Sequence, residues 1–117
     1  MNYMLLIHEP RGQRAERTRA EGEAAYAAMQ GFARELQARG VFRACDSLLT
    51  DDRGTCVQVR DGRPRMVDGP FSESKEMVGG YFLVDCATRE QALAIAAECP
   101  AAAWATVEVR PVGPCFI

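Results

Sequence analysis

Two places in the chain hold side chains that could carry out acid–base chemistry. His8 is the only histidine and ends the apolar run 3–8; an imidazole titrates near neutral pH and is the usual general base. Asp68 opens the turn Asp68-Gly69-Pro70, and its carboxylate could serve as a general acid or base. Each residue also has a structural alternative. His8 can hydrogen-bond locally at a strand end, and Asp68 can accept hydrogen bonds from the amides of its own turn.

The segment after this turn could bind a ligand. Glu73, Lys75 and Glu76 could hold a polar or anionic molecule, with Lys75 as the charge partner. Phe71 could form a pocket wall. The alternative is an ordinary solvated loop that Phe71 anchors to the core. Polar groups at the mouth of a buried strand are nevertheless where a site is expected.

The strand that follows begins with Gly79-Gly80 and continues with Tyr81. Paired glycines at a strand start indicate a β-bulge or the close approach of a ligand or another backbone. Tyr81 could offer its hydroxyl to the same region, or its ring could belong to the core or an interface. Gly79, Gly80 and Tyr81 therefore complete the candidate ligand-binding set.

The motifs of metal, phosphate and nucleophile sites are absent from the sequence. The five cysteines lie far apart, without a C-x-x-C pair, and a single histidine accompanies them. We therefore expect no metal and no cofactor, and reduced thiols that fill apolar space. Cys115, near the C-terminal end, is the thiol that we expect to be exposed.

Composition limits the classes of partner. With 117 residues, a net charge of −2 and a pI near 5.4, the chain predicts a single domain, 1–117, without an electrostatic case for nucleic acid or an anionic membrane. The apolar runs are too short to cross a bilayer. The first residues are typical of a strand rather than a signal peptide, so we expect a cytoplasmic protein.

Two helices are expected. Thr18 and Glu21 match a capping box that opens a helix ending at Arg39-Gly40. The apolar stripe of this helix contains Ala25, Met29, Phe32 and Leu36. A second capping box over 88–91 opens a helix that Pro100 ends, with a stripe of Ala92, Ile95, Ala96 and Cys99.

The strands surround these helices. Asp61-Gly62 joins two strand-like runs as a two-residue hairpin, and Pro64 restricts its second arm to an edge. The other strands are expected over 3–8, 41–49, 77–85 and 104–110. The resulting βαββαβ order with a hairpin insert predicts an α+β, ferredoxin-like sandwich with both helices on one face of an antiparallel sheet. The uncovered apolar face then predicts a homodimer that pairs sheet to sheet.

The run Asp68-Gly69-Pro70-Phe71-Ser72-Glu73-Ser74-Lys75-Glu76, followed by Gly79-Gly80-Tyr81-Phe82, resembles the signature of the DGPF branch of the YCII-related family. Residues 4–7 and 107–112 also resemble this family, so the similarity spans nearly the whole chain. The resemblance implies a dimeric α/β-barrel in which ferredoxin-like protomers pair through their sheets.

The same resemblance implies less about chemistry. Some YCII-related proteins resemble a dehydrochlorinase-type enzyme with a His–Asp pair, and the position of that His corresponds to Met29 here. Because the first helix contains no His, the pair is not carried over. Two functions stay open: binding of a small polar or aromatic molecule beside the 68–75 loop, with acid–base catalysis by Asp68 or His8, or a non-catalytic accessory module with a sigma-factor-like regulatory protein as partner.

Overall fold

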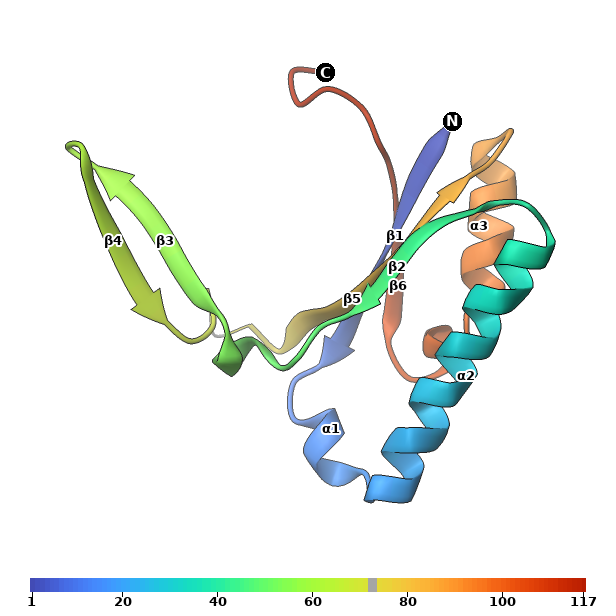
Figure 1. The fold of residues 1–117 in the computed structure, drawn as a ribbon, viewed down its shortest axis with the longest axis horizontal. Coiled ribbons are helices and arrows are strands. Elements are labelled where there is room, and N and C mark those ends of the chain that lie inside the picture. Colours follow the sequence, from blue (N-terminus) through green and yellow to red (C-terminus); the bar gives the residue numbers. More distant parts are fainter. Residues whose placement is uncertain (72–73) are drawn as a thin grey trace.

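A computed structural model describes residues 1–71 and 74–117 of the chain. Two α-helices lie against one sheet, and a separate two-stranded ribbon extends away from it (Figure 1). The elements in chain order are β1 (Asn2–Pro10), α1 (Gln13–Glu16), α2 (Arg19–Ala38), β2 (Phe42–Ser47), η1 (Asp51–Arg53), β3 (Thr55–Arg60), β4 (Arg63–Asp68), β5 (Glu76–Asp85), α3 (Arg89–Glu98), η2 (Pro100–Ala103) and β6 (Thr106–Pro111).

The main sheet is antiparallel, with strand order β2-β5-β1-β6. Helices α2 and α3 both lie on the same side of it (Figure 1). The expected α+β class is confirmed, and the strand order is consistent with a ferredoxin-like fold. The short helix α1, between β1 and α2, was not expected from the sequence.

The core lies between the helices and one face of the sheet. Along β1 every second side chain is buried, from Tyr3 to Glu9, as alternation along a strand requires. The Phe32 and Phe82 rings meet edge to face at 5.2 Å between centroids. The stripe expected on α3 is buried throughout, at Ala92, Ile95, Ala96 and Cys99.

The N-terminal caps follow the sequence. At α2 the Thr18 hydroxyl accepts from the Glu21 amide while the Glu21 carboxylate accepts from the Thr18 amide, so the expected capping box forms. At α3 the Thr88 hydroxyl accepts from the Gln91 amide. The Gln91 side chain there accepts from the amide of Ala87 rather than from that of Thr88, so this second capping box is shifted by one residue.

The apolar stripe of α2 is buried only in its second half. Phe32 and Leu36 are 3% and 0% exposed, whereas Ala25 and Met29 are half-buried. The expectation of one fully buried stripe is therefore wrong for the first half of the helix. Beside that half, space is left between α2 and the sheet.

The second face of the sheet carries no helix. Pairing of Met4 with Leu83 and of Leu6 with Tyr81 places these side chains together on this face, and all four residues are half-buried. We call it the open face. The pairing of β1 with β5 on this face is apolar, as the sequence predicts, whereas β6 adds Glu108 and Arg110 beside Leu6 and Met4.

The ribbon formed by β3 and β4, which we call the arm, extends to the side of the sheet opposite α2 and α3 (Figure 1). Asp61 and Gly62 both have positive φ, 52° and 72°, as the expected two-residue hairpin requires. Every residue of β4 is exposed. The arm accounts for a radius of gyration of 16.0 Å, where about 13 Å is expected for a compact chain of this length.

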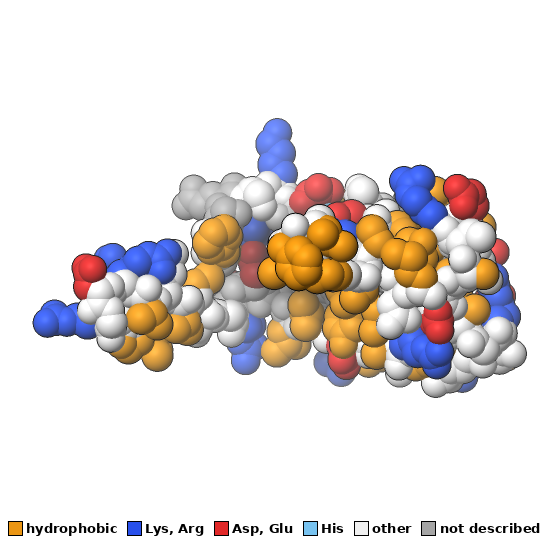
Figure 2. Space-filling model, turned by 90° about the horizontal axis from the view of Figure 1, so that it is seen from above, with side chains coloured by type: hydrophobic (Ala, Val, Ile, Leu, Met, Phe, Trp, Pro, Cys, Tyr) orange, Lys and Arg blue, Asp and Glu red, His pale blue; other side chains and the backbone are white. Residues whose placement is uncertain are grey.

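The arm has two chemically different faces. The register pairs Val57 with Met66 and Val59 with Pro64 on one face, and Val57, Val59 and Met66 are each more than half exposed. Gln58, Arg60, Arg63 and Arg65 lie on the other face. Figure 2 shows the arm at left, with hydrophobic side chains along its lower side and cationic ones along its upper side.

Candidate functional site

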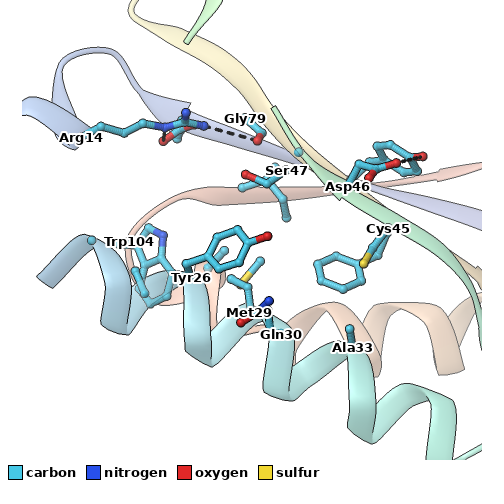
Figure 3. Close-up of a pocket in the computed structure, with 18 of the residues that line it drawn as sticks. Arg14, Tyr26, Met29, Gln30, Ala33, Cys45, Asp46, Ser47, Gly79 and Trp104 are labelled. Atoms are coloured by element: carbon cyan, nitrogen blue, oxygen red, sulfur yellow. Dashed lines mark hydrogen bonds and ion pairs between the residues drawn. The ribbon is translucent and has the colours of Figure 1, made fainter. Parts of the chain in front are cut away.

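A cleft of about 480 Å³ lies between the first half of α2 and the sheet. Figure 3 shows Tyr26, Met29 and Gln30 rising from α2, with Cys45 and Ser47 on the strand opposite and Trp104 at one side. The remaining lining is mostly apolar or small and includes Ile7, Gly22, Ala25, Ala33, Phe82 and Ala101. A concave, largely apolar space with a few converging polar groups is the usual form of a small-molecule site.

A buried ion pair lines part of this cleft. The Glu9 side chain is only 7% exposed and accepts two hydrogen bonds from Arg14, at 3.1 Å from Nε to Oε2 and 2.5 Å from Nη2 to Oε1. Arg14 Nη2 also donates to the Gly79 carbonyl at 3.3 Å (Figure 3). A buried carboxylate is costly unless it is paired and hydrogen-bonded, so Glu9 depends on Arg14.

The glycine pair makes room for these groups. A Cβ on Gly79 would lie 1.8 Å from Glu9 Oε1, and one on Gly80 would lie 2.8 Å from the Asp46 carbonyl oxygen. The β1–β5 register shifts where Ile7 pairs with Gly80 and His8 with Val78, leaving Gly79 unpaired. The expected bulge and close approach are both present, and the approaching groups belong to the protein itself.

A cation lies beside the aromatic wall of the cleft. The Arg17 guanidinium carbon is 5.4 Å from the centre of the Trp104 ring, within cation–π range. Gln13 links the two residues: its Nε2 donates to the Trp104 carbonyl at 2.7 Å, and its Oε1 accepts from Arg17 Nη2 at 3.3 Å. The segment between β1 and α2 thus supplies both arginines of the cleft.

The thiol of Cys45 also lines the cleft. Burial and, secondarily, the Asp46 carboxylate raise the pKa of Cys45 above its ordinary value of 9.0. The thiol is therefore neutral near pH 7 and poorly suited to act as a nucleophile. Met29, at the position where the resemblance places a family histidine, lines the cleft with a thioether instead.

His8 lies outside this cleft. It pairs with Thr106 and Val78 in the sheet, so its side chain is on the open face. Its Nε2 lies 2.7 Å from Glu108 Oε1, and Arg110 binds the other carboxylate oxygen at 2.6 Å. Hydrogen bonds from His8 first, and then from Arg110, lower the pKa of Glu108 below its ordinary value of 4.5.

Asp68 and its neighbours lie at the base of the arm. Asp68 ends β4, is exposed, and accepts from the Thr55 hydroxyl at 2.9 Å. Phe71 is 84% exposed, and the Lys75 carbonyl accepts from the Arg11 amide at 2.8 Å. Glu73 lies outside the described residues. Asp68, Phe71 and Lys75 do not line the cleft.

Of the candidate ligand-binding residues, Gly79, Gly80 and Tyr81 line the cleft. Tyr81 lies in a strand at the edge of the cleft, but its side chain is on the open face of the sheet. There its hydroxyl donates to Asp46 Oδ2 at 3.0 Å. This hydrogen bond to a carboxylate raises the pKa of Tyr81 above its ordinary value of 10.0. The structure therefore separates the candidates into three groups, at the cleft, on the open face and at the arm.

Sequence reasoning did not select Glu9, Arg14, Arg17 or Trp104. One available signal was Glu9, which continues the alternation of Leu5 and Ile7 and so places a carboxylate on the core face of β1. A charge at a core position requires a partner, and Arg14 was within reach in sequence. Trp104, the single tryptophan, offered no comparable signal.

Two kinds of site are not found in the part of the chain that the structure describes. No three residues among His, Cys, Asp and Glu group there in a way that could hold a metal ion. No described helix combines the length and hydropathy needed to span a membrane.

Comparison with known proteins identifies relatives over almost the full length. Residues 1–115 match the family described as the YCII-related domain. The chain is 26% identical over 114 residues to an uncharacterized protein of Rhizobium meliloti (strain 1021). That match covers 96% of this chain and 92% of the relative.

Proposed function

The chain belongs to the YCII-related family, and we propose that it is a homodimeric member of the DGPF branch that binds a small, mainly apolar molecule in the cleft between α2 and the sheet. The observation that carries this proposal is the half-buried first part of α2, which leaves about 480 Å³ lined by apolar and aromatic groups. A core helix ordinarily buries its whole stripe, so this space is a specific departure from packing.

Binding is better supported than catalysis. The carboxylate of the cleft already accepts hydrogen bonds from Arg14, and its thiol is neutral. His8 and Asp68, the candidate acid–base residues, lie outside the cleft lining. An acid–base step that uses either residue would therefore require a second site.

A thermal-shift screen of the purified protein against a metabolite library tests the binding proposal, because a ligand of the folded state raises the Tm. Ala33 lines the cleft from α2, so Ala33→Phe should obstruct it and abolish the shift given by a hit. Asp68→Asn, on the arm, should retain that shift. Hits that Ala33→Phe retains and Asp68→Asn loses would contradict the cleft and favour the 68–75 loop.

Two surfaces support the homodimer. The open face presents Met4, Leu6 and Leu83 without a covering helix. The arm extends to the same side of the sheet (Figure 1) and exposes Val57 and Met66. A two-stranded ribbon is marginally stable alone in water. A second copy packed against the open face would lie beside the arm. It would then cover the apolar residues of the sheet and those of the arm.

The solution mass tests the dimer, and one substitution on each side of the sheet sharpens the test. Leu6→Glu places a charge on the open face and should give monomers, whereas Leu93→Glu, at an exposed position on α3, should leave the mass unchanged. Analytical ultracentrifugation distinguishes these outcomes. A monomeric parent protein would contradict the dimer and favour the accessory-module alternative, in which a regulatory protein covers these surfaces.

A further inference from the structure

We infer that the ligand of the cleft is a carboxylic acid with an apolar, planar body, and that Arg17 binds its carboxylate. This inference rests on the proposed small-molecule function of the cleft and assigns its substrate class. It uses a cation that neither the sequence motifs nor the family resemblance selects.

Four charged residues line the cleft, the acids Glu9 and Asp46 and the bases Arg14 and Arg17. Glu9 and Arg14 neutralise each other. Asp46 accepts from Tyr81, and its register partner places its carboxylate on the open face. Of these four residues, Arg17 is therefore the cation of the cleft that no carboxylate on the helix side of the sheet pairs with.

Arg17 has no ion-pair partner among the described residues. The Glu21 carboxylate interacts with the charge of Arg17 through space, as the smallest of the effects on the pKa of Glu21. The Glu21 carboxylate is already committed to capping the Thr18 amide. A ligand carboxylate would therefore find a guanidinium that has no salt bridge to give up.

The guanidinium is also held in position before a ligand arrives. Trp104 supports one face of the group, and Gln13 accepts one of its N–H bonds. The other N–H groups lie in the plane of the guanidinium, the geometry in which arginine binds a carboxylate through two parallel hydrogen bonds. Such preorganisation reduces the entropy lost on binding.

The rest of the cleft selects an apolar, planar body. Tyr26 and Met29 project from α2 into the cleft, with Trp104 to one side of them (Figure 3), and Ile7, Phe82 and Ala101 extend the apolar lining. Aromatic and thioether groups contact planar rings favourably. The volume of about 480 Å³ suits a molecule of one or two rings.

Matched pairs of acids and amides test the inference. Phenylacetate, cinnamate and 4-hydroxybenzoate are titrated calorimetrically beside phenylacetamide, cinnamamide and 4-hydroxybenzamide, which have nearly the same shape without the charge. At least one acid should bind about tenfold more tightly than its amide, and this preference should decrease with added salt because screening weakens the charge interaction.

Variants of Arg17 identify the cation. Arg17→Gln should lower acid affinity about tenfold and leave amide affinity unchanged, whereas Arg17→Lys, which retains the charge, should keep a preference for the acid. Arg19→Gln is the matched control, because Arg19 is an exposed arginine of the same region that pairs with Glu23. It should leave both affinities unchanged.

The outcomes separate this inference from the proposed function. Equal binding of acids and amides, or an acid preference that survives Arg17→Gln, overturns the carboxylate assignment while the cleft remains a binding site. If none of the acids binds but an uncharged library compound binds and Ala33→Phe abolishes that binding, the substrate class is again wrong. If Ala33→Phe removes no binding at all, the proposed function itself fails.

Discussion

Gly79 is the residue on which the charged part of the cleft depends most directly. It lies in the bulge of β5, and any side chain there would enter the space of the Glu9 carboxylate. The position therefore combines a backbone irregularity with a steric requirement. The steric requirement is the one that only glycine meets, because a Cβ would lie 1.8 Å from Glu9 Oε1.

We expect Gly79→Ala to lower the free energy of unfolding by about 1–3 kcal/mol, the usual cost of overpacking, and to displace Glu9 from Arg14. Urea denaturation measures the first effect. Gly31→Ala in α2 is the control, because its new Cβ would meet only the tip of Arg34 at 3.9 Å. This control should raise stability by up to about 1 kcal/mol through helix propensity. A Gly79→Ala protein as stable as its parent would contradict the close approach.

Glu108 provides a prediction about pH. Its pKa in the folded protein lies below 4.5 because His8 and Arg110 hydrogen-bond to its carboxylate. The ionised form is therefore favoured by folding, and this stabilisation is present above pH 4.5 and lost as the pH falls through the folded pKa.

Urea midpoints test the direction of this pH dependence. They are measured at neutral pH and at a pH below the pKa of a free carboxylate. The parent protein should lose more stability on acidification than Glu108→Gln, in which the titrating group is absent. Glu23→Gln controls for the removal of one negative charge from an exposed ion pair. An identical acid response in the parent and Glu108→Gln would show that the contacts of Glu108 with His8 and Arg110 together contribute nothing.

At the scale of the element, the apolar stripe of α2 has two roles that look the same in the sequence. Its second half packs into the core, and its first half lines the cleft. The capping box of α2 and its period of apolar residues predicted the helix, and both are present. The same period predicted burial of Ala25 and Met29, yet these residues line the cleft. Hydrophobic spacing cannot distinguish a core-facing stripe from the wall of an apolar pocket, because both require the same side chains on the same face.

The remaining site residues were less accessible to sequence reasoning for another reason. Arg14 and Arg17 belong to the short connection around α1, a four-residue helix without buried residues, so no apolar pattern marks it in the sequence. The two arginines belong to the site because they contact Glu9, Gln13 and Trp104. Trp104 is distant from them in the chain. Only the tertiary structure brings Trp104 to them.

The arm was predicted from Asp61-Gly62, and its amphipathic register leads to an element-scale prediction. Val57 and Gln58 are adjacent in β3 and lie on opposite faces of the arm. If the apolar face contacts a second copy, Val57→Lys should weaken dimerisation by about tenfold or more, since a buried Val side chain is worth about 1.5–3 kcal/mol.

Gln58→Lys adds the same charge to the other face and should leave the dimer dissociation constant unchanged. Sedimentation at a series of protein concentrations measures both variants. Equal weakening by the two substitutions would indicate a general charge effect, and no weakening by either would remove the arm from the interface.

At the scale of the whole molecule, the sheet separates two surfaces. The cleft lies on the side of α2, whereas the open face and the arm lie on the other (Figure 1). Ligand binding and self-association can therefore be tested by independent variants. The family and the α+β class could be predicted from the sequence because motif and element order extend along the chain, while the site depends on contacts across the sheet.

The most direct test of the account is the indole N–H signal of Trp104 in a two-dimensional NMR spectrum, recorded during titration with the best-binding acid. Because Trp104 is the single tryptophan and lines the cleft, this one signal reports on cleft occupancy. We expect it to shift saturably in the parent protein and to remain unchanged in Ala33→Phe. Saturable binding that leaves the Trp104 signal unmoved would place the ligand elsewhere and contradict the proposed site.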